Sequence, residues 1–249
     1  MSVSLKTKSD LEKLRLAGKI TAGALAAAGN VIKPGVTTKE VDRVVHDYIV
    51  SHNAIPSFLN YDGFPASACI SVNEEVIHGI PGKRVLKEGD IVSVDVGAKI
   101  DGFHGDSAFT FCCGKVSKEA QDLLNSTQEA LKAGILAAKA NNRLGDIGEA
   151  IQKYVEERGY GVVRDYVGHG VGRNLHEDPE VPNFGKAGHG LRLVPGMVIA
   201  IEPMITAGTF EVEVLSNDWT VVTKDSSLAA HFEHTIAITP NGPIILTTE

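Results

Sequence analysis

The sequence predicts an α+β fold made of two similar halves that share one core. Two helices followed by several strands are predicted twice along the chain, which suggests a duplication. One four-residue spacing recurs 107 positions later, in Leu86, Gly89, Ile91, Asp95 and in Leu193, Gly196, Val198, Glu202. Four more residues match at an offset of 106: Val41, Val45, Tyr48, Ile49 and Ile147, Ile151, Tyr154, Val155. We therefore expect a single domain, 1–249, with antiparallel strands, two helix pairs, pseudo-twofold symmetry and halves of about 1–115 and 116–249.

Composition excludes several classes of protein. A hydrophobic content of 43% is ordinary for a globular enzyme, and a net charge of −7 argues against a nucleic-acid groove. Three cysteines are too few for a disulfide framework, so a reducing compartment fits. The apolar run Ala22–Ala28 belongs to an amphipathic pattern, and we find neither a signal peptide nor a membrane span. We expect a cytoplasmic protein.

Helix signals organise the first part of the chain. Ser9-Asp10-Leu11-Glu12 reads as a capping box that begins a helix reaching about Gly29. Thr37-Thr38-Lys39-Glu40 reads as a second capping box, with a helix to about Ser51. The next segments read as short strands or loops, followed by a turn that carries His78: 58–64, 68–72 and 77–82.

A hairpin with an unusual pair of acids follows. Val92, Val94 and Val96 alternate with small or polar neighbours, as in a strand, yet Asp95 lies among them. Asp106 begins a second strand after a turn at 99–102, so we expect the two carboxylates to face each other across the hairpin. A cation between them would keep both ionised. Taken alone, Asp106 is more typical of a turn residue than of a metal ligand, so the metal hypothesis depends on the rest of the chain.

The second half repeats the pattern of helices and strands. Ser117 caps a helix from Lys118 to about Ala140, and another runs from about Gly145 to Arg158. A glycine-rich loop around His169 follows. The remaining predicted elements are strands: 197–201, 210–215, 219–223, 232–239 and 244–246.

Five side chains in these elements predict a metal centre. Glu202 and Glu233 lie in strands too apolar for solvated carboxylates, and no Lys or Arg lies near them in these strands. The glycines around His169 allow its imidazole to be exposed. The full set has many oxygens and one nitrogen: Asp95, Asp106, His169, Glu202 and Glu233. Two divalent ions, manganese, iron or cobalt, with zinc as a further option, suit it and would lie about 3.5–4 Å apart around an activated water.

Several motifs together resemble the methionine aminopeptidase family over essentially the whole chain. They are Asp95 with Asp106, Gly168-His169-Gly170-Val171-Gly172, Ile201-Glu202-Pro203-Met204, His231-Phe232-Glu233-His234-Thr235 and Asn73-Glu74-Glu75-Val76-Ile77-His78-Gly79-Ile80-Pro81. The family has the duplicated pita-bread fold. Because His176 and Glu202 are 26 residues apart, with no room for a helical insertion, the chain resembles the bacterial type I form. The resemblance implies removal of the N-terminal methionine from nascent polypeptides with a small second residue, by attack of a metal-bridging hydroxide.

The resemblance also implies roles for residues outside the ligand set. His78 would contact the scissile amide, His176 would polarise the carbonyl oxygen, and Glu202 would act as general base and acid. His104, two residues before Asp106, would contact that ligand without binding the metal itself. The implied substrate pocket, which suits a flexible thioether, comprises Phe58, Tyr61, Phe64, Cys69, His78, Leu175, His176 and Trp219. We expect a monomer that binds no membrane, with ribosome association as an open expectation.

Two other functions remain open at this point. A proline-directed aminopeptidase of the same fold would carry the same five ligands, but such enzymes usually have a large additional N-terminal domain. A pita-bread protein that binds without catalysis would have lost ligands, whereas this sequence keeps all five.

Overall fold

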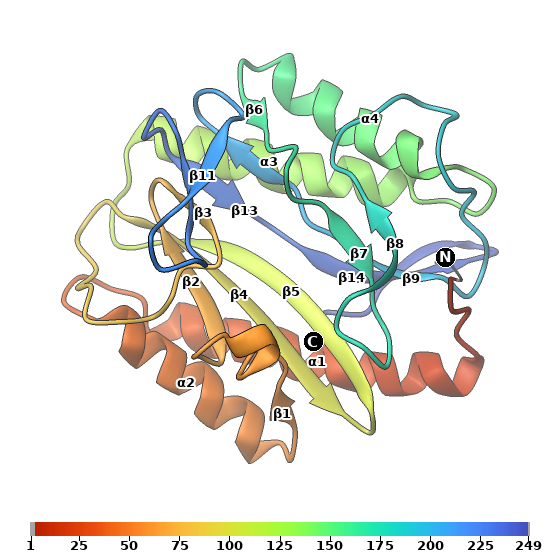
Figure 1. Ribbon diagram of the computed structural model, residues 1–249, viewed down its shortest axis with the longest axis horizontal. Helices are drawn as coiled ribbons and strands as arrows, with labels where there is room; N and C mark the ends of the chain where they lie inside the picture. Colours follow the sequence, from red (N-terminus) through yellow and green to blue (C-terminus); the bar gives the residue numbers. More distant parts are fainter. Residues whose placement is uncertain (1–2, 249) are drawn as a thin grey trace.

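Two pairs of helices flank a central layer of strands in the computed structural model, which describes residues 3–248 (Figure 1). In the view of Figure 1 the first pair lies below the strands and the second pair above them. The four α-helices are α1 (Lys8–Val31), α2 (Thr38–Ser51), α3 (Lys118–Ala137) and α4 (Leu144–Glu156). The predicted α+β class, with two helix pairs and antiparallel strands, is confirmed.

The strands in the first half are β1 (Ile55–Pro56), β2 (Ala68–Val72), β3 (Glu75–Ile77), β4 (Ile91–Ile100) and β5 (Phe103–Cys112), with a 3-10 turn η1 (Tyr61–Gly63). Those in the second half are β6 (Gly161–Val162), β7 (Gly168–Gly170), β8 (Glu177–Val181), β9 (Val198–Ile201), β10 (Met204–Thr206), β11 (Val212–Val214), β12 (Val221–Thr223), β13 (Ala229–His231), β14 (His234–Thr239) and β15 (Gly242–Ile245). In the described part of the chain they form four antiparallel sheets with the orders β1-β4-β2 (with β5 beside β4), β15-β14-β9-β7-β8, β13-β10-β6 and β11-β12-β3.

The helix starts are partly as predicted. The capping box of α2 is the predicted pair Thr37 and Glu40. For α1 the prediction was wrong, because Thr7 is the N-cap and pairs with Asp10, so the helix begins earlier than Ser9. Thr7-x-x-Asp10 offers the same reciprocal hydrogen bonds as Ser9-x-x-Glu12, and the earlier pair adds residues to the helix.

Some element ends also differ from the prediction. Helix α3 ends at Ala137, before the predicted Ala140, because the Asn142 side chain donates a hydrogen bond to the Ala137 carbonyl. The predicted strand 232–239 begins at His234, and a separate strand, β13, ends at His231. Phe232 and Glu233 therefore form a break between two strands.

The β4–β5 hairpin has a different register from the predicted one. Its turn is Asp101-Gly102, with φ of 52° and 79°, as a two-residue hairpin requires. Asp106 is therefore paired with Gly97, and Asp95 with Ala108. The two acids are two residues out of direct opposition, but they still lie on one face because side chains alternate with a period of two.

Each helix pair packs its apolar side on neighbouring strands. Buried residues of α1 and α2 pack with β2 and β4, and those of α3 and α4 pack with strands of the second half, including β9. In each half a helix pair is thus followed by a strand that carries or precedes a predicted ligand. The internal duplication stays a prediction.

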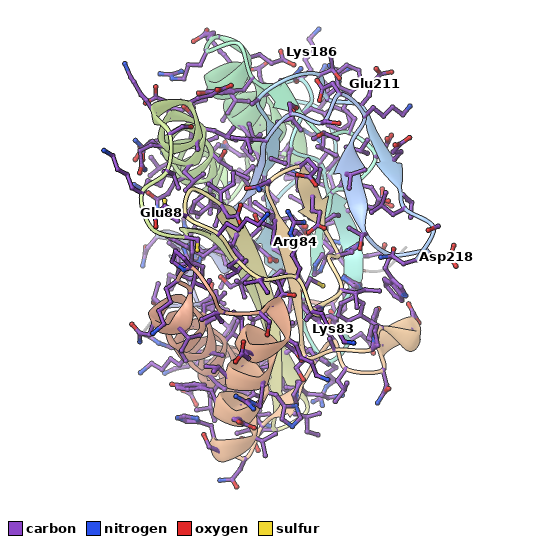
Figure 2. The ribbon with its side chains drawn as sticks, turned by 90° about the vertical axis from the view of Figure 1, so that its left-hand side faces the viewer. Lys83, Arg84, Glu88, Lys186, Glu211 and Asp218 are labelled. Atoms are coloured by element: carbon purple, nitrogen blue, oxygen red, sulfur yellow. The ribbon has the colours of Figure 1, made fainter. Side chains whose placement is uncertain are left out.

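Within residues 3–248, no helix has the length and hydrophobicity to cross a membrane. Charged side chains of both signs lie on the face shown in Figure 2.

Candidate functional site

The two halves are joined by hydrogen bonds beside the predicted metal ligands. The Thr235 hydroxyl donates to the Asp106 carbonyl at 2.7 Å and accepts from the Asp106 amide at 3.0 Å. Ser107 Oγ donates to the Glu233 carbonyl at 2.6 Å, and the Glu233 amide donates to the Ala108 carbonyl at 2.9 Å. These bonds hold β5 against the start of β14, so the positions of Asp106 and Glu233 are fixed relative to each other.

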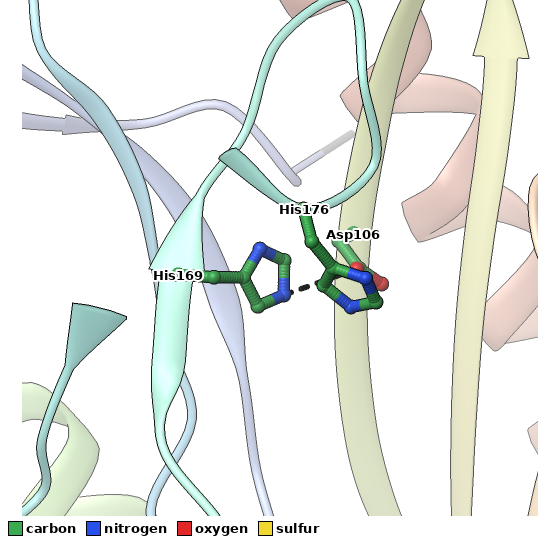
Figure 3. Close-up of side chains that lie close together, drawn as sticks. All are labelled: Asp106, His169 and His176. Carbon is green, nitrogen blue, oxygen red and sulfur yellow. Dashed lines mark ion pairs between the residues drawn. The ribbon is translucent and has the colours of Figure 1, made fainter. Parts of the chain in front are cut away.

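All five predicted ligands meet at this junction. Carboxylate oxygens of Asp95, Asp106 and Glu233 lie within 4.8 Å of one another, and so do donor atoms of His169, Glu202 and Glu233. His169 Nε2 lies 3.6 Å from Asp106 Oδ2 and 3.5 Å from Glu202 Oε1. Figure 3 shows His169 directed toward Asp106, with His176 beside them.

The cluster contains four carboxyl groups and is largely shielded from water. Burial raises the pKa of Asp95 to about 7. Burial, and after it the charge of neighbouring carboxylates, raises the pKa values of Asp106, Glu202 and Glu233 well above their usual range. Burial lowers the pKa of His169 to about 3, with His176 as a second cause, so His169 is neutral near pH 7. These shifts reflect the cost of gathering four carboxylates without a compensating cation.

The donors fit a pair of divalent cations. Among the described residues, three buried carboxylate oxygens of the cluster have no hydrogen-bond partner: Asp95 Oδ1, Asp106 Oδ1 and Glu233 Oε1. Within residues 3–248, the ion pairs of these carboxylates are with histidine, and no Lys or Arg contributes. Two divalent cations would balance four carboxylate charges and would use the unpartnered oxygens. The mixture of oxygen donors with one imidazole suits manganese, iron or cobalt.

The cluster lines a cavity of 680 Å³. An apolar group of side chains forms part of its wall, and these residues also pack on one another: Phe58, Phe64, Cys69 and Leu175. Tyr61 and Trp219 complete this wall, and His78 and His176 face the same cavity. An apolar wall beside a group of polar, metal-binding donors is typical of a small-molecule or side-chain pocket.

Comparison with known proteins assigns the family. The profile of metallopeptidase family M24 matches residues 12–240. The chain belongs to metallopeptidase family M24. It is 57% identical to the methionine aminopeptidase of Clostridium acetobutylicum, over 98% of both chains. The crystal structure of the Thermotoga maritima methionine aminopeptidase superposes with a TM-score of 0.98 at 48% identity, covering 100% of both chains. The Pyrococcus furiosus prolidase gives a TM-score of 0.78 at 25% identity and is covered over 65% of its length.

In this M24 metallopeptidase, every residue predicted for the pocket lines the cavity. Other lining residues were not predicted, among them Asp62, Tyr166 and Glu180. His231, for which no role was predicted, is buried, and its Nε2 lies 3.7 Å from Glu202 Oε2 without a hydrogen bond among the described residues. His104, the predicted support of Asp106, has its Nδ1 at 2.9 Å from Ser57 Oγ. The signal for His231 in the sequence is its place in the motif 231–235, two residues before Glu233.

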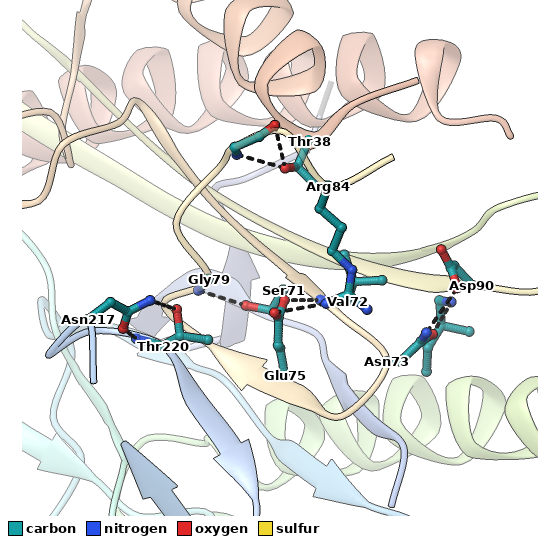
Figure 4. A network of polar contacts seen from close by, with 12 residues as sticks. Thr38, Ser71, Val72, Asn73, Glu75, Gly79, Arg84, Asp90, Asn217 and Thr220 are labelled. Atoms are coloured by element: carbon teal, nitrogen blue, oxygen red, sulfur yellow. Dashed lines mark hydrogen bonds and ion pairs between the residues drawn. The ribbon is translucent and has the colours of Figure 1, made fainter. Parts of the chain in front are cut away.

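The backbone holds His78 toward the cavity of the metallopeptidase. His78 has a φ of 58°, in the left-handed region that costs energy for a residue other than glycine. The next amide, of Gly79, donates to Ser71 Oγ at 3.0 Å (Figure 4). A Cβ at Gly79 would lie 2.2 Å from the Ile70 carbonyl oxygen, so only glycine fits there. The turn therefore fixes the direction of the imidazole.

A buried ion pair supports the loop that carries His176. Lys6 Nζ lies 2.5 Å from Glu177 Oε2, and the side chains are 5% and 13% exposed. The other oxygen, Glu177 Oε1, accepts from the Asn174 amide at 3.1 Å. Leu175 and His176 lie between these two residues. The pair thus connects the segment before α1 to the pocket wall.

Lys6→Met should lower the free energy of unfolding by about 3 kcal/mol, because the Glu177 charge would stay buried without its partner. Replacing Glu177 with Gln in the same protein should restore part of that loss, since no charge is then left unpaired. Urea denaturation of both variants measures the difference. A Lys6→Met variant as stable as the wild type would show that the ion pair contributes no stability.

Proposed function

We propose that the protein removes the N-terminal methionine from polypeptides whose second residue is small. The observation that carries this proposal is the apolar pocket, whose lining also includes the four carboxylates, buried or half-buried, and a neutral histidine. The names of the related M24 enzymes from Clostridium and Thermotoga support it. The apolar wall can accept one side chain and place the first peptide bond beside the cluster.

In this proposal Asp95, Asp106, His169, Glu202 and Glu233 hold two divalent ions, of manganese, iron or cobalt, with zinc also compatible. Such ions would supply Lewis-acid polarisation of the scissile carbonyl and an activated water as nucleophile. The protein's own contribution is a largely buried site in which the five donors are already in place. Hydrogen bonds of β5 to the start of β14 keep that geometry without rearrangement.

Proton transfer and charge stabilisation fall to three side chains. A carboxylate oxygen of Glu202 accepts the proton of the attacking water and returns it to the nitrogen of the leaving amine. His78, held by its turn, contacts the scissile amide. His176 donates a hydrogen bond to the carbonyl oxygen, where negative charge develops. Both imidazoles are neutral near pH 7, because burial lowers the pKa of His78 to about 4 and also lowers that of His176.

The methionine side chain is proposed to occupy the apolar part of the cavity. Phe64 and Trp219 meet edge to face there, with ring centroids 5.1 Å apart, and the buried Cys69 of β2 lines the same cavity. Burial raises the pKa of the Cys69 thiol, so it stays an uncharged thiol against the thioether. Tyr61 and His176 contact each other in the cavity lining, and we propose that they leave little room for a long second residue.

Peptide hydrolysis tests the proposal. The metal-loaded enzyme should cleave Met-Ala-Ser and Met-Ser-Ser, and it should cleave Met-Lys-Ser at least about 100-fold more slowly, since a long side chain would clash at the mouth. An Ala-Pro peptide should not be hydrolysed. Efficient cleavage of the Ala-Pro peptide would favour the proline-directed alternative, and no hydrolysis of any peptide by metal-loaded protein would refute catalysis.

We also propose that the enzyme is a single domain that works as a cytoplasmic monomer on nascent chains at the ribosome. Three free cysteines, two of them buried, are compatible with a reducing compartment. One cooperative unfolding transition, the mass from light scattering and cosedimentation with ribosomes test these three statements separately. A dimer in solution, two transitions or no cosedimentation would contradict the corresponding part.

A further inference from the structure

Two histidines of the site differ in what faces their Nδ1 atoms. His169 Nδ1 lies 2.9 Å from the Gly170 carbonyl oxygen, which can only accept a hydrogen bond. In a neutral imidazole that makes this bond, the single proton lies on Nδ1, and Nε2 keeps a free lone pair toward Asp106 and Glu202. That is the tautomer that a metal ligand needs.

His176 has a different partner. Its Nδ1 lies 2.8 Å from the hydroxyl of Tyr61, and a phenol can donate a hydrogen bond. Burial, and then the charges of Asp62 and Asp106, raise the pKa of Tyr61, so the phenol keeps its proton near neutral pH. Within residues 3–248, this is the one hydrogen bond that the hydroxyl makes. If Nδ1 carried the imidazole proton, the phenol proton would have no protein acceptor.

The tautomer of His176 matters because the ring is close to the metal centre. Donor atoms of Asp106, His169 and His176 lie within 4.8 Å of one another. The two imidazoles meet edge to face, with their ring centroids 4.3 Å apart (Figure 3). With a lone pair on Nε2, His176 could become a sixth ligand. With a proton on Nε2, it cannot coordinate through that atom and can only donate a hydrogen bond.

We propose that Tyr61 is a positioning residue whose hydroxyl donates to Nδ1 of His176, keeps the imidazole proton on Nε2, and so makes His176 a hydrogen-bond donor to the substrate carbonyl instead of a metal ligand. The inference rests on the proposed peptidase function for the substrate part, while the choice of tautomer stands on the hydrogen bonds alone.

The backbone around Tyr61 is suited to this role. The Tyr61 amide donates to the Phe58 carbonyl, and the Phe64 amide donates to the Tyr61 carbonyl, each at 2.9 Å. Asn60, just before the turn, has a φ of 65°, which asparagine tolerates better than most residues. The rings of Tyr61 and His176 meet edge to face, with their centroids 5.1 Å apart. Together with the tight turn η1, this contact places the Tyr61 hydroxyl opposite Nδ1 of His176.

Nitrogen NMR of the zinc-loaded, 15N-histidine-labelled protein tests the tautomer. His176→Ala assigns the His176 signals. In the wild type, Nε2 of His176 should carry the proton, and in Tyr61→Phe the proton should shift partly or wholly to Nδ1. Tyr166→Phe, which removes the hydroxyl of another tyrosine in the same cavity, should leave the His176 signals unchanged. A wild-type proton on Nδ1, or an unchanged pattern in Tyr61→Phe, would overturn the proposal.

Kinetics test whether Tyr61 acts through His176. With Met-Ala-Ser, Tyr61→Phe should lower kcat about 10-fold, with KM within about twofold and metal content unchanged. In a His176→Ala background the same change should alter kcat by less than about twofold, because coupled residues are not additive. Independent losses that multiply would overturn the proposal. If the wild type cleaves no peptide, the proposed function fails, whereas the NMR result still decides the tautomer.

Discussion

Glu233→Gln should remove most of the bound metal and lower kcat/KM by at least about 10³-fold. Glu233 belongs to two of the three groups of donors that could hold an ion, and its Oε1 is buried without a partner. The amide keeps the shape of the side chain but removes the charge that binds a cation. Metal catalysis contributes several kcal/mol, and each 1.4 kcal/mol is about tenfold in rate. Metal analysis and peptide hydrolysis measure the two losses together.

The stability of the metal-free protein separates loss of metal from misfolding. Metal-free Glu233→Gln should be at least as stable as the metal-free wild type, because one of four buried like charges is gone. Glu213→Gln, on the exposed side of β11, is the matched control and should keep both metal and activity. A Glu233→Gln protein with full metal content and full activity would show that Glu233 is not a ligand.

The metal centre could be predicted because its residues conflict with their surroundings. A carboxylate in an apolar strand, such as Asp95, or directly after one, such as Glu202, needs a compensating charge, and the strands offered none. Glycines on both sides of His169 gave a similar local signal. Such conflicts are visible along the chain for most of the donors, whereas Asp106 was recognised through its expected place opposite Asp95 in the hairpin.

Features set by competition between similar local signals were less predictable. Two overlapping capping boxes exist at the start of α1, and the structure uses the one at Thr7. The hairpin could turn at either of two neighbouring positions. Because it turns at Asp101-Gly102, the cross-strand partner of Asp106 is Gly97 and not Asp95. A register shift of two residues leaves both side chains on the same face of the sheet, so the two carboxylates still lie on one side.

Individual ion pairs and hydrogen bonds between side chains of distant segments could not be predicted. The Lys6–Glu177 pair joins residues 171 positions apart. The hydrogen bond of Tyr61 to His176 joins residues 115 positions apart. Neither partner is unusual in its own segment, since charged and aromatic residues are common in loops. Only the packing of the two halves brings them together, so their roles emerge from the three-dimensional structure.

His78→Asn should keep its metal and lose about 10²-fold in kcat. His78 lies in the cavity wall, with ring centroids 5.8 Å from Tyr166 and 6.2 Å from Trp219. It belongs to none of the groups of described donors that could hold an ion. Asparagine tolerates the φ of 58° at this position better than alanine, so the turn should keep its shape while the imidazole is removed.

The comparison of metal content with rate decides between the possible roles of His78. Metal analysis should give the wild-type value, and steady-state hydrolysis of Met-Ala-Ser should show the loss in kcat with a smaller change in KM. Such a loss indicates an interaction made mainly in the transition state. His52→Asn, at the exposed end of α2, is the control and should behave as the wild type. Loss of metal in step with activity would instead make His78 a ligand, because an imidazole that only contacts the substrate has no effect on metal affinity.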